Sequence, residues 1–173
     1  MRNRPIVGAL RIAAGLALLT TIVIQVTDRA LNNAFDPWEY FSYFTIESSL
    51  INIVVFVVGG VMALRLATDT ELFTTIRMAT LTYAVVTAGV YNLLLRNVPY
   101  TGSFVGLQWP NEIIHVWVPL FILLDWILSP GRPSLKWKSL RVVVIFPVLW
   151  LIYTLMRGAA SSGEIYPLSL IHI

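Results

Sequence analysis

The segment Asn111–Ile127, which reads NEIIHVWVPLFILLDWI, is apolar enough to cross a membrane but carries polar residues that such helices rarely contain. Asn111, His115 and Pro119 follow one another at steps of four, so an α-helix places them on one face. An ionisable group within an apolar span is costly and marks a candidate site. The competing interpretation is a structural histidine that hydrogen-bonds a neighbouring helix.

Composition agrees with a membrane protein. Of 173 residues, 57% are hydrophobic and 12% are charged, whereas a soluble domain has about 25% charged residues. The net charge of +3 is spread over short loops and gives no reason to expect a nucleic-acid partner. The absence of cysteine excludes disulfides and thiol catalysis. We expect no cofactor and no metal.

The fold class predicted is all-α, a polytopic transmembrane helix bundle forming one domain over residues 1–167. Arg11 lies near the start of the first span, and we expect it to snorkel to the membrane surface. The five apolar spans are predicted at residues 5–26, 41–64, 76–95, 111–128 and 140–156.

The last six residues, LSLIHI at 168–173, resemble a translated sequencing adapter. We therefore predict that they are not native and that a sixth helix has been lost by C-terminal truncation, and we assign no role to His172.

Polar residues form a stripe in the second span. Thr45, Ser48, Ser49 and Asn52 follow the i, i+3, i+4, i+7 spacing of one helical face. Small hydroxyl residues also allow helices to pack closely, which is the alternative interpretation.

Further polar residues come from other spans at the same predicted depth. Tyr91 and Asn92 end the third span, and Arg157 ends the fifth. A threonine hydroxyl becomes a nucleophile when a neutral histidine takes its proton, so Thr45 and His115 are the candidate catalytic pair. Asn111, Asn52 or a backbone N–H is a candidate oxyanion donor, and Glu112 is the nearest carboxylate that could orient His115.

These residues carry a resemblance. The chain resembles the androgen-induced and androgen-dependent TFPI-regulating membrane proteins, and in particular their bacterial branch. The resemblance covers most of residues 40–167 and rests on four motifs: Tyr43-Phe44-Thr45, Asn111-x-x-x-His115-x-x-x-Pro119, Tyr153-Thr154-x-x-Arg157-Gly158 and Tyr166-Pro167. It implies a bundle of about six helices and a threonine hydrolase of fatty acid esters of hydroxy fatty acids, in which Thr45 is the nucleophile and His115 the essential histidine.

The leading hypothesis is therefore an intramembrane Thr/His hydrolase acting on lipid-like esters, with membrane lipid as its surroundings. A small transporter whose polar stripes line a path, or a non-catalytic membrane scaffold, remains open as an alternative. The substrate and the oligomeric state are not specified by the sequence.

Basic residues predict the orientation. The N-terminus and the loops near 65–77 and 132–141 hold most of the arginine and lysine, which predicts a multi-pass cell-membrane protein with a cytoplasmic N-terminus. Single cysteines at Asn33 and Ser134 test this with an impermeant thiol reagent on intact cells. We expect labelling at 33 and none at 134, and the reverse pattern would invert the orientation.

Overall fold

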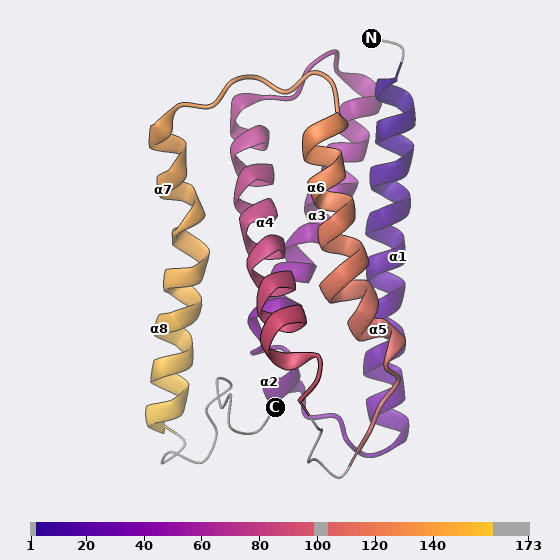
Figure 1. Ribbon diagram of the computed structural model, residues 1–173, viewed down its shortest axis with the longest axis vertical. Helices are drawn as coiled ribbons and strands as arrows, with labels where there is room; N and C mark the ends of the chain where they lie inside the picture. The colour runs from indigo at the N-terminus through magenta and orange to yellow at the C-terminus, as the bar shows by residue number, and fades with distance from the viewer. Residues whose placement is uncertain (1–2, 99–103, 161–173) are drawn as a thin grey trace.

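The computed structural model describes residues 3–98 and 104–160, and these residues form an all-α bundle (Figure 1). Five helices are long and apolar enough to cross a membrane, which confirms the predicted fold class. The first three spans are α1 (Arg4–Leu31), α3 (Phe44–Arg65) and α4 (Glu71–Val90), the last of which continues into the π-helix η1 (Tyr91–Leu95).

The remaining spans are composite. The fourth is built from α5 (Trp109–Glu112), the π-helix η2 (Ile113–Trp117) and α6 (Val118–Leu128). The fifth consists of η3 (Trp137–Ser139), α7 (Leu140–Val143) and α8 (Ile145–Ala160). The short helix α2 (Pro37–Tyr40) lies in the connection before α3.

Local chemistry explains several of these boundaries. Asp36 caps α2 by accepting hydrogen bonds from the backbone N–H groups of Trp38 and Glu39. Thr70 caps α4 in the same way, through the N–H of Phe73. Residues 71–75, predicted as part of a charged loop, are therefore helical, and α1 extends to Leu31, beyond the predicted residue 26.

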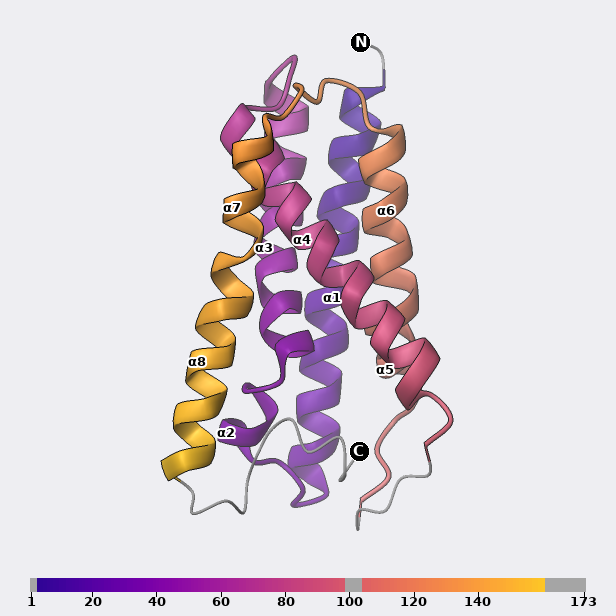
Figure 2. The ribbon, with the colours of Figure 1, turned by 60° about the vertical axis from the view of Figure 1, so that its left-hand side comes forward.

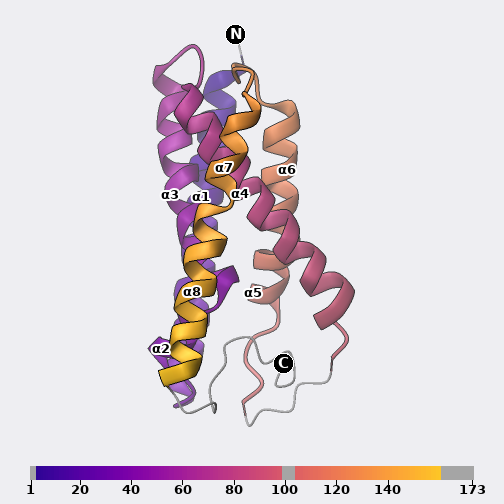
Figure 3. The ribbon, with the colours of Figure 1, turned by 90° about the vertical axis from the view of Figure 1, so that its left-hand side faces the viewer.

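The helices form one bundle with two distinct ends. We call the end that carries the N-terminus the N-terminal end, and the opposite end, where α2 and α5 lie, the distal end (Figure 1). Figures 2 and 3 show α8 at the edge of the bundle, beside the start of α3. An aromatic cluster joins it there, with Phe44 of α3 packed against Phe146 and Trp150 at centroid distances of 5.0 and 5.3 Å.

The predicted non-native tail and the C-terminal region before it fall at residues 161–173 and lie outside the described residues. The same holds for Tyr166-Pro167, the last of the motifs that carry the family resemblance.

Helices α1 and α3 touch through glycines. A Cβ at Gly60 would lie 2.5 Å from Cγ1 of Ile12 and 2.8 Å from the carbonyl oxygen of Gly8, closer than real Cβ atoms approach. The contact therefore brings one backbone onto another, as small residues permit in membrane bundles.

We expect Gly60→Ala to destabilise the bundle through this contact, and Gly89→Ala is the matched control because a Cβ at Gly89 meets nothing within 4 Å. Both changes make the same gain in helix propensity, so their difference isolates the packing. Gly60→Ala should be less stable than Gly89→Ala by about 1–3 kcal/mol in reversible unfolding from detergent. Equal stability of the two variants would show that the helices separate at no cost.

Candidate functional site

The imidazole of His115 is held in one orientation by its own helix. Its Nδ1 lies 3.0 Å from the carbonyl oxygen of Asn111, one turn earlier. A carbonyl oxygen can only accept, so Nδ1 carries the proton and Nε2 keeps its lone pair. Within the described residues Nε2 has no hydrogen bond, and His115 therefore presents a free base.

The ring of Tyr91 packs against one face of the His115 imidazole. The two rings stack at a centroid distance of 4.2 Å and an interplanar angle of 16°. Glu112, the predicted orienting carboxylate, has other partners than His115. Its Oε1 accepts a hydrogen bond from the hydroxyl of Tyr91, and its Oε2 lies 2.6 Å from the guanidinium of Arg96. The prediction that Glu112 orients the ring is thus not met, since the backbone of Asn111 does so.

The proline in the motif leaves a carbonyl without its helical donor. Pro119 has no N–H, so the carbonyl oxygen of His115, four residues earlier, cannot form the usual helical bond. Asn92 of η1 donates to that oxygen at 3.4 Å and to Ala88 at 2.8 Å. Asn92 thus joins the third and fourth spans where both are π-helical, a backbone form common at functional sites.

A neutral hydrogen-bond chain connects this region to α1 and α2. The hydroxyl of Tyr40 donates to Oε1 of Gln25 at 2.7 Å, and Nε2 of Gln25 donates to Oδ1 of Asn111 at 3.0 Å. Burial raises the pKa of Tyr40 to about 12, so the phenol stays protonated and remains a donor near neutral pH. The amide oxygen of Asn111 is therefore engaged in this chain.

Thr45 lies in the first turn of α3 and is half-buried. Among residues 3–98 and 104–160 no hydrogen bond joins its hydroxyl to His115 or to any other group. Ser48 donates to the carbonyl oxygen of Thr45 at 3.1 Å. Ser48, Ser49 and Asn52 are all buried, at 3, 4 and 4% exposure, so the polar stripe of α3 faces the inside of the bundle.

Arg157 belongs to a separate group around Ser42, a residue that the sequence analysis did not single out. Ser42 is 1% exposed, and its hydroxyl contacts the guanidinium of Arg157 and, at 2.9 Å, the hydroxyl of Tyr153. The indole N–H of Trp150 donates to the backbone carbonyl oxygen of Ser42 at 2.9 Å. These contacts fasten α8 to the turn that precedes Thr45. No periodicity marks Ser42, because it lies in a connection.

The N-terminal end contains buried charges that the sequence analysis placed at the surface. Arg11 was expected to snorkel to the membrane surface, but it is 1% exposed and its Nε donates to the carboxylate of Asp125 at 3.0 and 3.1 Å. Asp69 and Arg77 were expected in a charged loop and are also buried. A partner within the bundle removes the need to reach the headgroups.

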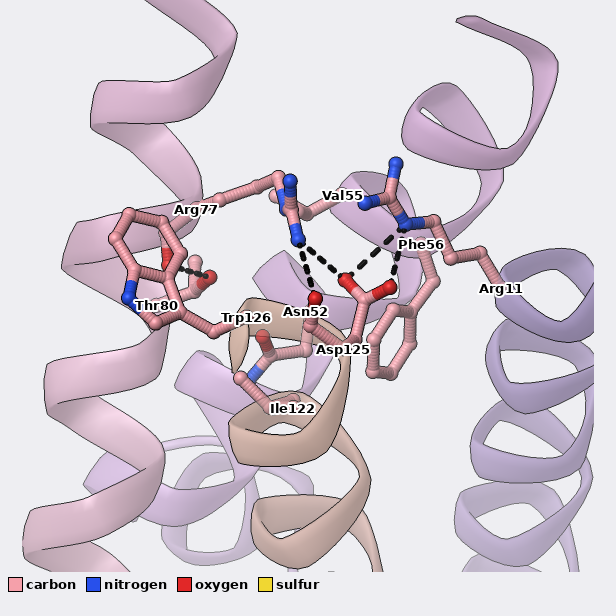
Figure 4. Close-up of a pocket in the computed structure, with 9 residues that line it drawn as sticks. All are labelled: Arg11, Asn52, Val55, Phe56, Arg77, Thr80, Ile122, Asp125 and Trp126. Atoms are coloured by element: carbon pink, nitrogen blue, oxygen red, sulfur yellow. Dashed lines mark hydrogen bonds and ion pairs between the residues drawn. The ribbon is translucent and has the colours of Figure 1, made fainter. Parts of the chain in front are cut away.

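Two aspartates hold three arginines there. Asp125 of α6 lies between Arg11 of α1 and Arg77 of α4, with 2.6 Å separating its Oδ2 from Nη2 of Arg77 (Figure 4). Asp69 contacts Arg4 and Arg77, each at 2.8 Å, and lies 3.8 Å from Nη1 of Arg11. We call these five residues the ionic cluster. In the part of the chain that the structure describes, no group of three or more histidine, cysteine, aspartate or glutamate side chains is placed to hold a metal ion.

The chain is thus an all-α protein with five helices that could span a membrane, polar groups at the distal end and an ionic cluster at the N-terminal end. No protein-family model, no curated protein and no solved structure matches it.

The ionic cluster predicts a strong effect of removing one carboxylate. Asp125→Asn removes the nearest carboxylate of both Arg11 and Arg77 and leaves Asp69 alone against three buried arginines, and loss of one partner of a buried pair costs about 3–5 kcal/mol. Glu112→Gln is the control, since its pair with Arg96 is 34–44% exposed and is worth about 0–1 kcal/mol. Unfolding in detergent measures both, and a cost below about 1 kcal/mol for Asp125→Asn would contradict a structural role.

Proposed function

We propose that this chain is an intramembrane hydrolase of lipid esters, in which Thr45 is the nucleophile and His115 the general base. The main support for the proposal is the tautomer and hydrogen bonding of His115. Asn111 fixes the proton on Nδ1 and leaves Nε2 without a partner, which is the arrangement that a general base requires. The family resemblance in the motifs around Thr45 and His115 points to the same pair.

The reaction has two halves. In the first, Oγ1 of Thr45 attacks the ester carbonyl while Nε2 of His115 takes the hydroxyl proton, and the alcohol leaves with that proton. In the second, water gives a proton to His115 and its oxygen attacks the acyl-threonine, which releases the acid and restores both residues. The first half requires Nε2 within hydrogen-bond reach of Oγ1, directly or through one water.

Other polar residues then act on the pair without reacting. Tyr91 stacks on the imidazole, and Asn92 stabilises the π-helical turn that bears it. Arg157 acts through Ser42 and so positions the turn before Thr45. Asn52 lies deeper in the bundle, where it lines a cavity with Arg77 and Asp125, so the oxyanion donor remains open between Asn111 and a backbone N–H.

The surroundings favour a lipid-like substrate. Both residues lie on helices apolar enough for a membrane, so a substrate that partitions into the bilayer reaches them directly. With the cytoplasmic N-terminus that we propose from the basic loops, the pair lies toward the outer leaflet of the cell membrane.

One observation favours the scaffold alternative. Gln25, Tyr40, Asn111 and Asn92 all hydrogen-bond between segments, which is how polar residues hold membrane helices together. A scaffold needs these bonds but has no use for Oγ1 of Thr45, and this difference separates the two functions.

Substitution of the pair tests the hydrolase. Thr45→Ala removes the atom that forms the acyl intermediate, so turnover of a lipid ester should fall by several orders of magnitude, while Thr45→Ser should keep part of it. His115→Ala should lose nearly as much, and the double variant little more, because the two residues act as a unit. Ester hydrolysis in liposomes, per amount of folded protein, measures this.

Thr82→Ala is the matched control. Thr82 lies on α4, is exposed, and its hydroxyl donates only to Met78 of the same helix, so turnover should not change. In a scaffold, Thr45→Ala would behave like Thr82→Ala. Turnover near the wild-type value in Thr45→Ala would therefore rule out the hydrolase.

A further inference from the structure

The ionic cluster carries a net charge of +1. Arg4, Arg11 and Arg77 contribute three guanidinium groups against the two carboxylates of Asp69 and Asp125, and all five side chains are at most 9% exposed. An unbalanced buried charge is strongly unfavourable, so a counter-charge is expected close by.

The hydrogen bonds show which guanidinium nitrogen of the cluster has no acceptor. Arg4 uses Nε, Nη1 and Nη2 on Leu66, Pro130 and Asp69. Both terminal nitrogens of Arg77 donate to aspartate. Arg11 uses Nε on Asp125 and Nη1 on Gly59, with Asp69 3.8 Å from Nη1, but its Nη2 is buried without a hydrogen-bond partner. The cluster thus has one excess charge, and a buried guanidinium nitrogen within it has no acceptor.

Arg11 also borders a cavity. The cavity measures about 10 Å³, enough for a single small occupant, and Arg77, Asp125, Asn52, Thr80 and Trp126 contribute to its wall (Figure 4). Oδ1 of Asn52, which is 4% exposed, likewise has no partner. Buried polar atoms without partners are rare in proteins and commonly indicate a bound water or ion.

We propose that this cavity binds one small monovalent anion of the size of chloride, against Nη2 of Arg11. Asp125 lies in the same wall, but both arginines already engage its carboxylate, so the charged groups of the wall sum to +1. A water would satisfy the free nitrogen and leave that charge unbalanced. The amide of Asn52, turned by 180°, offers Nδ2 as a second donor, since its two orientations have the same shape.

Thermal unfolding in different salts tests the site. The purified full chain in detergent is unfolded in sodium chloride, sodium bromide and sodium gluconate at equal ionic strength. Chloride and bromide should raise Tm saturably by several degrees over gluconate, because a ligand that binds the folded state stabilises it. Equal Tm in all three salts would show that the cavity holds only water and would overturn the proposal.

Two variants assign the effect to this cavity. Asn52→Asp places a carboxylate in the wall, and Arg11→Gln balances the cluster at two charges of each sign, so each should abolish the halide effect. Arg141→Gln removes an exposed charge from the same end and should keep it. A halide effect that persists undiminished in Asn52→Asp would place the ion elsewhere and also overturn the proposal. If Arg11→Gln fails to fold, the comparison of salts on the wild-type chain still supports or overturns the anion site.

Discussion

The bridge from Asp125 to Arg11 and Arg77 is the interaction on which this bundle depends. It joins α1, α4 and α6, three helices whose remaining contacts are largely apolar and would be nearly as favourable with lipid. Apolar packing alone gives such helices little preference for one arrangement. A shared carboxylate does give one, because any other arrangement leaves charges buried and unpaired. The glycine contact between α1 and α3 then brings Arg11 close enough to donate to Gly59 of α3.

The distal end is built on a different principle. Its contacts between segments include neutral hydrogen bonds, as in the chain from Tyr40 through Gln25 to Asn111. Its charged contacts are the partly exposed ion pair between Arg96 and Glu112 and the hydrogen bonds of single charged groups such as Arg157, rather than a buried cluster. Neutral bonds of this kind contribute about 0.6 kcal/mol each in membranes. Two of the spans are also π-helical there. The N-terminal end thus fixes the bundle, and the distal end can adjust at lower cost.

Hydropathy was enough to predict five spans, because the length of an apolar run follows directly from the sequence. The stripe through Ser48, Ser49 and Asn52 was also readable, since helical spacing alone puts these residues on one face, and that face is buried. The ionic cluster was not, because Arg11 and Asp125 are 114 residues apart and a charge near the end of a span looks the same whether it snorkels or pairs. Ser42 and Tyr40 lie in a connection, where no periodicity indicates which way a side chain points.

The division between the two ends bears on where chemistry can occur. A reacting group must have an atom that the fold leaves unengaged. At the N-terminal end nearly every polar atom of the ionic cluster is paired. The unpaired atoms of Arg11 and of Asn52 beside the cluster border a cavity too small for an ester. At the distal end Nε2 of His115 and the hydroxyl of Thr45 have no hydrogen bond within the described residues, while Nδ1 of His115, the amide oxygen of Asn111 and the amide nitrogen of Asn92 are all engaged. Among the polar atoms of this region that the fold leaves without a hydrogen bond are the imidazole nitrogen and the hydroxyl that a base and a nucleophile would use.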